Sequence, residues 1–346
     1  MLRAAFLDGV RTGLDLVTVE SSLAFLDRDR SADGLQDPTA AALTLAEYLA
    51  SIIGASALAI LHYGSRAQGR VVRPDSAFDF FILVDRYGPA YRALATAVGA
   101  RSRPRLAVAL AWILPPNVVS VRQQGSFGER EAKCVIISKR HFQRECSTRA
   151  RDQFVRGRLS QHIVRAWTRD AASAEEVGRW VREARDSSFD WLQAFLPAVF
   201  DVDQYCRSLL AVSIAHEIRL EARDHAETLF AAQRDTLREL YGPVLNRLAA
   251  RGVLERDGEK YVQRHLPGAL TRLRVHTRLR ISKWRTTLRL LKHPFLYDGW
   301  LDYLLRKIER STGEKIELTD RERRRPLIFL WPRAWRHLRR RPQLRR

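Results

Sequence analysis

Two small residues and one acid lie at positions that suit phosphate chemistry. Gly64 and Ser65 follow the apolar run 57–63, and Asp79 lies inside a second apolar run, 78–84. A Gly-Ser turn lets the backbone approach a triphosphate, and its N–H and hydroxyl groups donate to the phosphate oxygens. An acid within a strand is costly to bury unless it is paired or binds a metal. Mg²⁺ held there would offset the charge that develops during in-line displacement at the α-phosphorus.

This stretch resembles the DNA polymerase β-type nucleotidyltransferase superfamily, in which Gly-Ser precedes an Asp-x-Asp on the next strand. The matching residues are GSRAQG at 64–69, PDS at 74–76 and Asp79. The first acid of the superfamily pattern would fall at Ala77. Three interpretations stand: another carboxylate completes the metal site, the protein is a pseudoenzyme, or Ala77 is an engineered change. The candidate carboxylates are Asp75, Asp85, Glu129 and Glu131. The structural alternative is a buried Asp79 satisfied by Arg66 or Arg70.

A longer part of the chain is similar to the mitochondrial translocator-assembly-and-maintenance type of CDP-diacylglycerol synthase, a membrane-peripheral phosphatidate cytidylyltransferase. That family carries a single-acid strand motif, which AFDFFILVD at 77–85 matches, with Ala77 where the family has methionine. Its Pro-Asn turn, lysine strand and Ala-Gly-Arg-Leu helix end correspond to PNV at 116–118, AKCVIIS at 132–138 and FVRGRL at 154–159. Two departures are Arg66, where the family has the second glycine of Gly-Ser-Gly, and Cys134-Val135, where it has Tyr-Gly.

The second resemblance implies transfer of CMP from CTP to phosphatidate, giving CDP-diacylglycerol and pyrophosphate with Mg²⁺ as cofactor. Lys133 would pair with a triphosphate or lipid phosphate, and Arg158 would contact phosphate as well. The structural alternatives are a solvated lysine at a strand start and one arginine among many on a basic helix. The expected site comprises catalytic Asp79 and Lys133, nucleotide-binding Gly64, Ser65, Arg66 and Arg158, and metal-binding Asp79 with Asp85 or Asp75.

The hydrophobic pattern predicts a mixed α/β protein. Residues 1–27 are amphipathic with helical spacing, and a helix is expected from Asp37-Pro38 to Gly54. Apolar runs predict strands at 57–63, 78–84, 106–114 and 133–138. Helical periodicity then predicts helices at 139–156, 158–169, 174–194, 203–222 and 227–250, with a turn or hairpin at 251–262.

Three regions follow from these elements. We expect a small mixed-sheet nucleotidyltransferase domain at 1–140 and a mainly helical domain at 141–265, winged-helix-like through its hairpin. Residues 266–346 form a basic, helical C-terminal segment, in which 300–310 has helical spacing.

The charge balance predicts a polyanionic partner. The chain carries 60 Lys and Arg against 39 Asp and Glu, a net charge of +21, which exceeds what solubility needs. In the C-terminal segment, basic residues alternate with Trp284, Trp300, Trp331 and Trp335, which is typical of a membrane-surface anchor on anionic lipid. RNA, with tryptophan as a stacking platform, is the alternative partner, and a helical core with a basic end is the structural one.

The remaining signals concern the compartment. Three cysteines without a CxxC pair favour neither a disulfide framework nor a zinc site, so a reducing compartment is expected. No secretory signal is recognised in the first residues, and no apolar run reaches the length needed to span a bilayer. We therefore expect a peripheral membrane protein on the cytoplasmic side.

Overall fold

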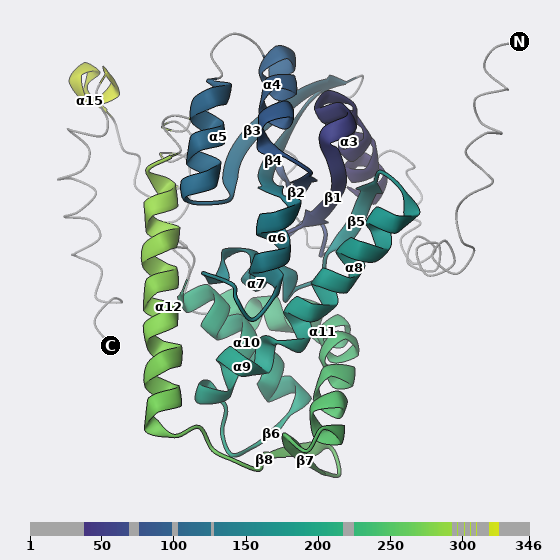
Figure 1. Cartoon of the computed structure of the whole chain (residues 1–346), viewed down its shortest axis with the longest axis vertical. Coiled ribbons are helices and arrows are strands. Elements are labelled where there is room, and N and C mark those ends of the chain that lie inside the picture. The colour runs from purple at the N-terminus through teal and green to yellow at the C-terminus, as the bar shows by residue number, and fades with distance from the viewer. Residues whose placement is uncertain are drawn as a thin grey trace, which may run out of the picture.

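The computed structural model describes residues 38–68, 76–98, 103–125, 128–216, 225–292 and 318–324, and positions 296, 301, 305 and 309. The helix expected within 1–27, Trp300, Trp331 and Trp335 lie outside these residues, as do most of 300–310 and the end of the helix expected at 203–222. The described part is a mixed α/β structure, as the sequence predicts (Figure 1).

A five-stranded mixed sheet, in the order β3–β4–β2–β1–β5, forms one centre of the molecule. Strands β2 and β4 are parallel, and the other neighbours are antiparallel. The strands are β1 (Ala57–Tyr63), β2 (Phe78–Val84), β3 (Asn117–Gly125), β4 (Gly128–Ser138) and β5 (Val164–Thr168). The strands predicted at 57–63, 78–84 and 133–138 are confirmed.

The predicted strand at 106–114 is wrong, because this run is helix α5 (Pro104–Ile113). A short apolar run does not by itself distinguish a strand from a buried helix. The missed signal is Pro104, which occupies the first turn of the helix, where proline is favoured. The third strand is instead β3, which follows directly and pairs with β4 along its whole length.

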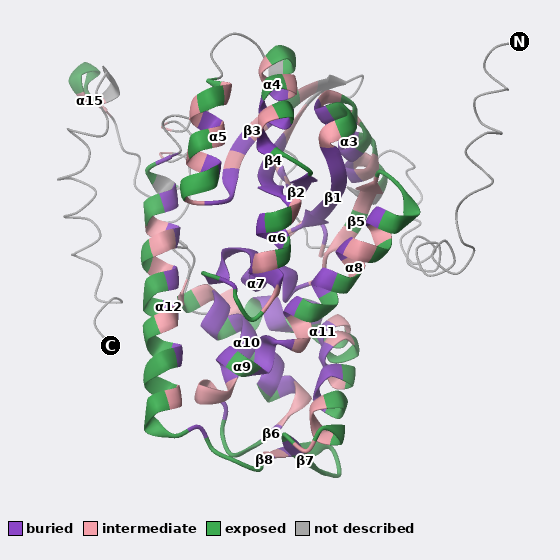
Figure 2. Ribbon diagram, in the orientation of Figure 1, coloured by how far each residue is buried: buried purple, intermediate pink, exposed green. Residues whose placement is uncertain are grey.

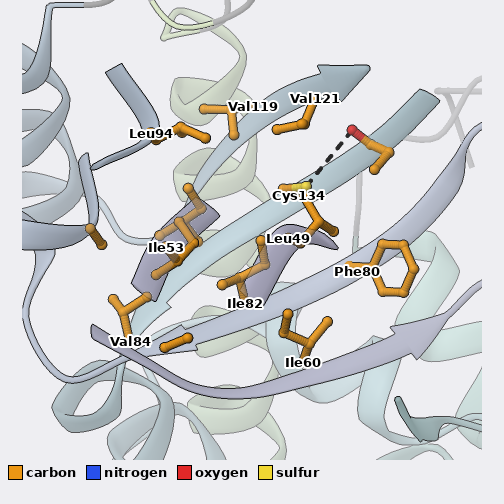
Figure 3. Packing of buried hydrophobic residues seen from close by; sticks show 14 of the residues in the cluster. Leu49, Ile53, Ile60, Phe80, Ile82, Val84, Leu94, Val119, Val121 and Cys134 are labelled. Carbon is orange, nitrogen blue, oxygen red and sulfur yellow. Dashed lines mark hydrogen bonds between the residues drawn. The ribbon is translucent and has the colours of Figure 1, made fainter. Parts of the chain in front are cut away.

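Helices that precede β3 cover one face of the sheet. They are α3 (Pro38–Ile53), which ends at the short helix η1 (Gly54–Ser56), α4 (Tyr87–Val98) and α5. Alternate strand residues point into this layer, among them Ile60, Phe80, Ile82 and Cys134 (Figure 3). Because α4 and α5 connect β2 to the parallel strand β4, they act as the crossover that a parallel pair requires.

Helices that follow β4 cover the other face. They are α6 (Lys139–Cys146), α7 (Gln153–Leu159) and α8 (Ala171–Asp186). Phe142, Val155 and Trp180 pack there against Phe81 and the neighbouring strand residues. The sheet core therefore continues past residue 140. The helices expected at 139–156 and 158–169 are partly wrong, since residues 147–152 are not helical and residues 164–168 form β5.

A second core lies among the later helices and a three-stranded sheet, β6–β8–β7. The expected hairpin is present as β7 and β8. The elements of this second core are α9 (Ser188–Leu192), η2 (Gln193–Phe195), β6 (Val199–Asp201), α10 (Val202–Ala215), α11 (His225–Ala250), β7 (Leu254–Asp257), β8 (Lys260–Gln263) and α12 (Ala269–Leu290). The short helix α15 (Asp320–Arg324) follows later in the chain.

Helix α12 runs alongside both cores (Figure 1). Val275 and Leu279 join the second core, whereas Ser282 accepts a hydrogen bond of 2.8 Å from the backbone N–H of Gln153 at the start of α7. Across the described ranges, no helix combines the length and apolar character needed to cross a bilayer.

Candidate functional site

Gly64 and Asp79 meet at one end of the sheet. Gly64 follows β1 with a φ of +85°, a conformation that favours glycine. A Cβ atom added to Gly64 would lie 2.7 Å from Oδ2 of Asp79. The two residues are brought together because Tyr63, the last residue of β1, is the antiparallel partner of Asp79. The turn backbone and the acid therefore touch, and a side chain at position 64 would separate them.

Lys133 lies beside Asp79 on the neighbouring strand. The two are register partners in the parallel pair β2–β4. Phe81 in β2 and Val135 in β4, two residues further on, belong to the core beneath α6, α7 and α8. Since alternate residues of a strand share a face, Asp79 and Lys133 both lie on that face. A carboxylate and an ammonium group thus stand on adjacent strands next to the Gly64 turn.

Arg66 connects this turn to the start of β2. Its Nε donates to the carbonyl of Ser76 at 2.9 Å, and its Cζ lies 4.4 Å from the ring centroid of Phe78. Ser65 is half-buried in the same turn, residues 64–68. The predicted nucleotide-binding residues of this turn therefore lie at the same end of the sheet as Asp79.

Arg158 of α7 brings a second guanidinium to this end. Its Nη1 donates to the carbonyl of Phe154 at 2.7 Å, and its Cζ lies 3.8 Å from the Phe154 ring centroid. The same Cζ is 5.8 Å from the ring of Tyr63, the residue before Gly64. The structure thus brings Gly64, Ser65, Arg66, Asp79, Lys133 and Arg158 to one region.

Asp85 does not join them. It follows β2 at the opposite end, about 20 Å from Asp79 at the rise of an extended strand. Its Oδ2 forms an ion pair of 2.5 Å with Arg169. One ion cannot reach both acids, so the assignment of Asp85 as a metal ligand is corrected on this ground. Asp75 and the side chain of Glu129 lie outside the described residues.

Glu131 takes the position that the geometry favours for a second carboxylate. It precedes Lys133 by two positions in β4 and so lies on the face of Asp79. The strand spacing and rise place the Cα atoms of Glu131 and Asp79 about 8 Å apart. Ser120 on β3 donates to Oε1 of Glu131 at 2.8 Å, which orients the carboxylate.

Two carboxylates on adjacent strands fit Mg²⁺. This ion takes one or two carboxylates and completes its shell with water and substrate phosphates. Within the described residues there is no cluster of three or more His, Cys, Asp or Glu that could hold a metal ion. Asp79 and Glu131 would leave the rest of such an ion's shell to water and substrate phosphates.

His62 is a neighbour of the site that sequence reasoning missed. Burial, and then the charge of Arg66, lower the pKa of His62 to about 4. The imidazole is therefore neutral at pH 7 and lies against the rings of Phe78 and Phe80 on the opposite face from Asp79. Its only sequence signal is a histidine inside an apolar strand.

Buried thiols do not add a nucleophile. Burial, and then the carboxylate of Asp79, raise the pKa of Cys134 far above its usual range. The Cys134 side chain lies in the core on the α3–α5 side (Figure 3), so it serves packing.

Comparison of the chain with known protein families and with curated proteins yields no match in either case.

Proposed function

We propose that the protein is a Mg²⁺-dependent nucleotidyltransferase of the polymerase β type, with its site at the Gly64 end of the sheet. The observation that carries the proposal is the contact between the Gly64 backbone and the Asp79 carboxylate, with Lys133 paired beside that acid. A flat backbone surface next to a carboxylate and a lysine is what a metal-bound triphosphate needs.

Each residue of the site would bind either the triphosphate or the metal ion. The turn at Gly64 and Ser65 donates N–H and hydroxyl groups to the β- and γ-phosphates, with Arg66 adding positive charge. Asp79 and Glu131 would hold Mg²⁺, which when bound would neutralise the charge that develops on the phosphates. Lys133 and Arg158 neutralise the remaining phosphate charge. His62, being neutral, leaves that task to the arginines and the lysine.

The favoured reaction is transfer of CMP from CTP to phosphatidate. A phosphate oxygen of phosphatidate attacks the α-phosphorus of CTP, the bond to the β-phosphate breaks, and CDP-diacylglycerol and pyrophosphate result. The single-acid motif AFDFFILVD at 77–85 and the lysine strand 132–138 support this choice over other transferases. The protein would act as a peripheral membrane enzyme on the cytoplasmic side, its basic C-terminal segment, 266–346, helping it reach the lipid.

Labelled CTP, Mg²⁺ and phosphatidate vesicles test the reaction directly. We expect labelled CDP-lipid from the unaltered protein and none from Asp79→Asn. Asp85→Asn is the matched control, because it removes the charge of an acid that directly follows the same strand, at the end far from the site. Equal loss in both variants, or a fully active Asp79→Asn, would contradict the proposed site.

Nucleotidyl transfer to an RNA or protein hydroxyl is the second candidate, favoured by the net charge of +21. It predicts labelling of RNA or protein, without CDP-lipid, in the same assay. A nucleotide-binding module without catalysis would bind CTP but label neither acceptor, and Asp79→Asn would leave its function intact.

A further inference from the structure

An apolar stripe runs along the outer face of α12. Its members are spaced three, four or eight residues apart, so they lie on one side of the helix. Leu270 and Trp284 are 81% and 70% exposed. In Figure 2 the first half of α12 is mostly exposed, whereas buried and intermediate residues alternate with exposed ones along its second half. The stripe, hereafter the α12 stripe, comprises Leu270, Leu273, Ile281, Trp284, Leu288 and Leu291.

A groove of about 730 Å³ opens beside the stripe. Leu270, Leu273 and Ile281 of the stripe line it together with arginines, and none of the lining residues is acidic. The arginines are Arg151, Arg274, Arg278 and Arg285.

Two of these arginines are held in place by the protein. Arg278 donates through Nη2 to the carbonyls of Thr148 and Ala150, at 2.8 and 2.7 Å. Arg285 donates through Nε to Asp152 at 3.1 Å. Positive charge is thus fixed beside an apolar strip, and this combination matches a phospholipid, which joins a phosphate to acyl chains.

The charge of α12 selects among the possible occupants. Residues 269–292 contain eight Lys and Arg and no Asp or Glu. A second copy docked face to face would oppose like charges, which disfavours association. RNA would satisfy the arginines but would leave the aliphatic stripe in water. An anionic bilayer satisfies both features.

We propose that α12 is an interfacial helix that lies in the headgroup layer of an anionic membrane, with the α12 stripe toward the acyl chains and the groove arginines on lipid phosphates. The proposal deepens the proposed function and rests on it for the identity of the acceptor, whereas the surface chemistry stands independently. Within the basic C-terminal segment, 266–346, helix α12 would then be the element that docks on the membrane.

The docked helix adjoins the candidate site. Arg289 of α12 is buried and lies 4.8 Å from the ring centroid of Phe154, the ring on which Arg158 stacks. One aromatic ring therefore separates the membrane-facing helix from a guanidinium assigned to phosphate. Through its buried face, α12 therefore packs directly on the helix that carries Arg158.

The test is cosedimentation of the full chain with vesicles of phosphatidylcholine containing phosphatidate or phosphatidylserine. In the stripe variant, Leu273, Ile281 and Trp284 are all changed to Glu. We expect its partition onto anionic vesicles to fall at least about tenfold. Ile113→Glu is the matched control, since Ile113 is 73% exposed on α5, and it should bind as the unaltered protein does. Circular dichroism checks that both variants are folded.

Unchanged binding by the folded stripe variant would overturn the proposal. A dimer that the same substitutions dissociate in the absence of lipid, or salt-sensitive RNA binding that they abolish while vesicle binding persists, would also overturn it.

A second readout separates this inference from the reaction. Activity is measured with short-chain phosphatidate dispersed as monomers, which needs no docking. The stripe variant should retain activity there while losing activity on vesicles. If the unaltered protein binds vesicles through the stripe but transfers no nucleotide, the proposed function fails and the docking surface stands.

Discussion

Two separate features restrict position 64 to glycine. The φ of +85° disfavours any side chain, and a Cβ would come within 2.7 Å of Oδ2 of Asp79. Gly54 shares only the backbone restriction: its φ is +65°, but a Cβ there would meet nothing within 4 Å. Substitutions at these two glycines therefore distinguish the effect of backbone strain from the effect of crowding Asp79.

Gly64→Ala should reduce nucleotidyl transfer by more than its loss of folding stability would explain. Both Gly64→Ala and Gly54→Ala should lower the free energy of unfolding by about 1–2 kcal/mol through the φ term. Only Gly64→Ala displaces Asp79, and we expect about a 100-fold loss of nucleotidyl transfer, the scale of a 1 Å misplacement. Urea denaturation and the CTP assay measure the two effects. Equal activity in both variants would contradict the contact's role.

His62 should make the fold sensitive to acid. Its folded-state pKa of about 4 lies below the ordinary 6.5, so the unfolded chain binds the proton more readily. The stability from neutral His62 is complete above pH 6.5 and is lost as pH falls toward 4, in total about 3 kcal/mol. His62→Phe should flatten that part of the curve of unfolding free energy against pH. An unaltered curve in His62→Phe would exclude His62 as a source of the acid sensitivity.

At the scale of elements, α12 is fastened to the sheet domain by a buried acid. Asp152 begins α7 by accepting from the N–H of Phe154 at 3.1 Å, and it also pairs with Arg285 and Arg289 of α12. Burial alone would raise the pKa of Asp152, but the two arginines hold it below its usual range. One carboxylate thus connects the helix that carries Arg158 to the proposed membrane helix.

Removal of this acid should be costly. Asp152→Ala leaves two arginines without their partner in a largely buried setting, and we expect a loss of about 3–5 kcal/mol in unfolding free energy. Asp203 pairs likewise with two arginines, Arg234 and Arg238, but these are half-exposed. Asp203→Ala should therefore cost about 1 kcal/mol. Denaturant unfolding compares the two, and equal losses would show that the Asp152 cluster gains nothing from burial.

At the scale of the whole molecule, basic charge is concentrated late in the chain. The last 21 residues, 326–346, contain seven arginines and no acid. Charge near an anionic surface adds about 1 kcal/mol per basic residue and is screened within a Debye length. The apolar contact of the α12 stripe responds weakly to salt, so the two contributions can be told apart.

Deletion of 326–346 should weaken binding to anionic vesicles at low salt without unfolding the protein. At about 1 M salt, where the Debye length is ~3 Å, the truncated and full chains should bind alike. Vesicle cosedimentation over a salt series measures this. Unchanged low-salt binding after deletion would refute the C-terminal anchor, though not the α12 stripe.

The sequence by itself determined those helices and strands that short-range residue patterns specify. Alternation and apolar runs located β1, β2 and the core of β4, and Pro38 with Gly54 bounded α3. It also singled out Gly64, Ser65 and Asp79, because an acid inside an apolar strand and a Gly-Ser turn are recognisable by residue type alone. The sequence pattern misassigned α5, because the nine-residue apolar run 106–114 is compatible with either a buried strand or a buried helix.

Only the tertiary structure decided which of these residues meet. Strand register, which depends on pairing between segments far apart in sequence, set Lys133 beside Asp79 and brought Glu131 to the same face. The α12 stripe likewise emerged only from packing: its leucines resemble core residues in sequence, but α12 buries Val275 and Leu279 and leaves the stripe outward. A one-dimensional pattern records which side chains exist, and long-range packing determines which of them share a surface.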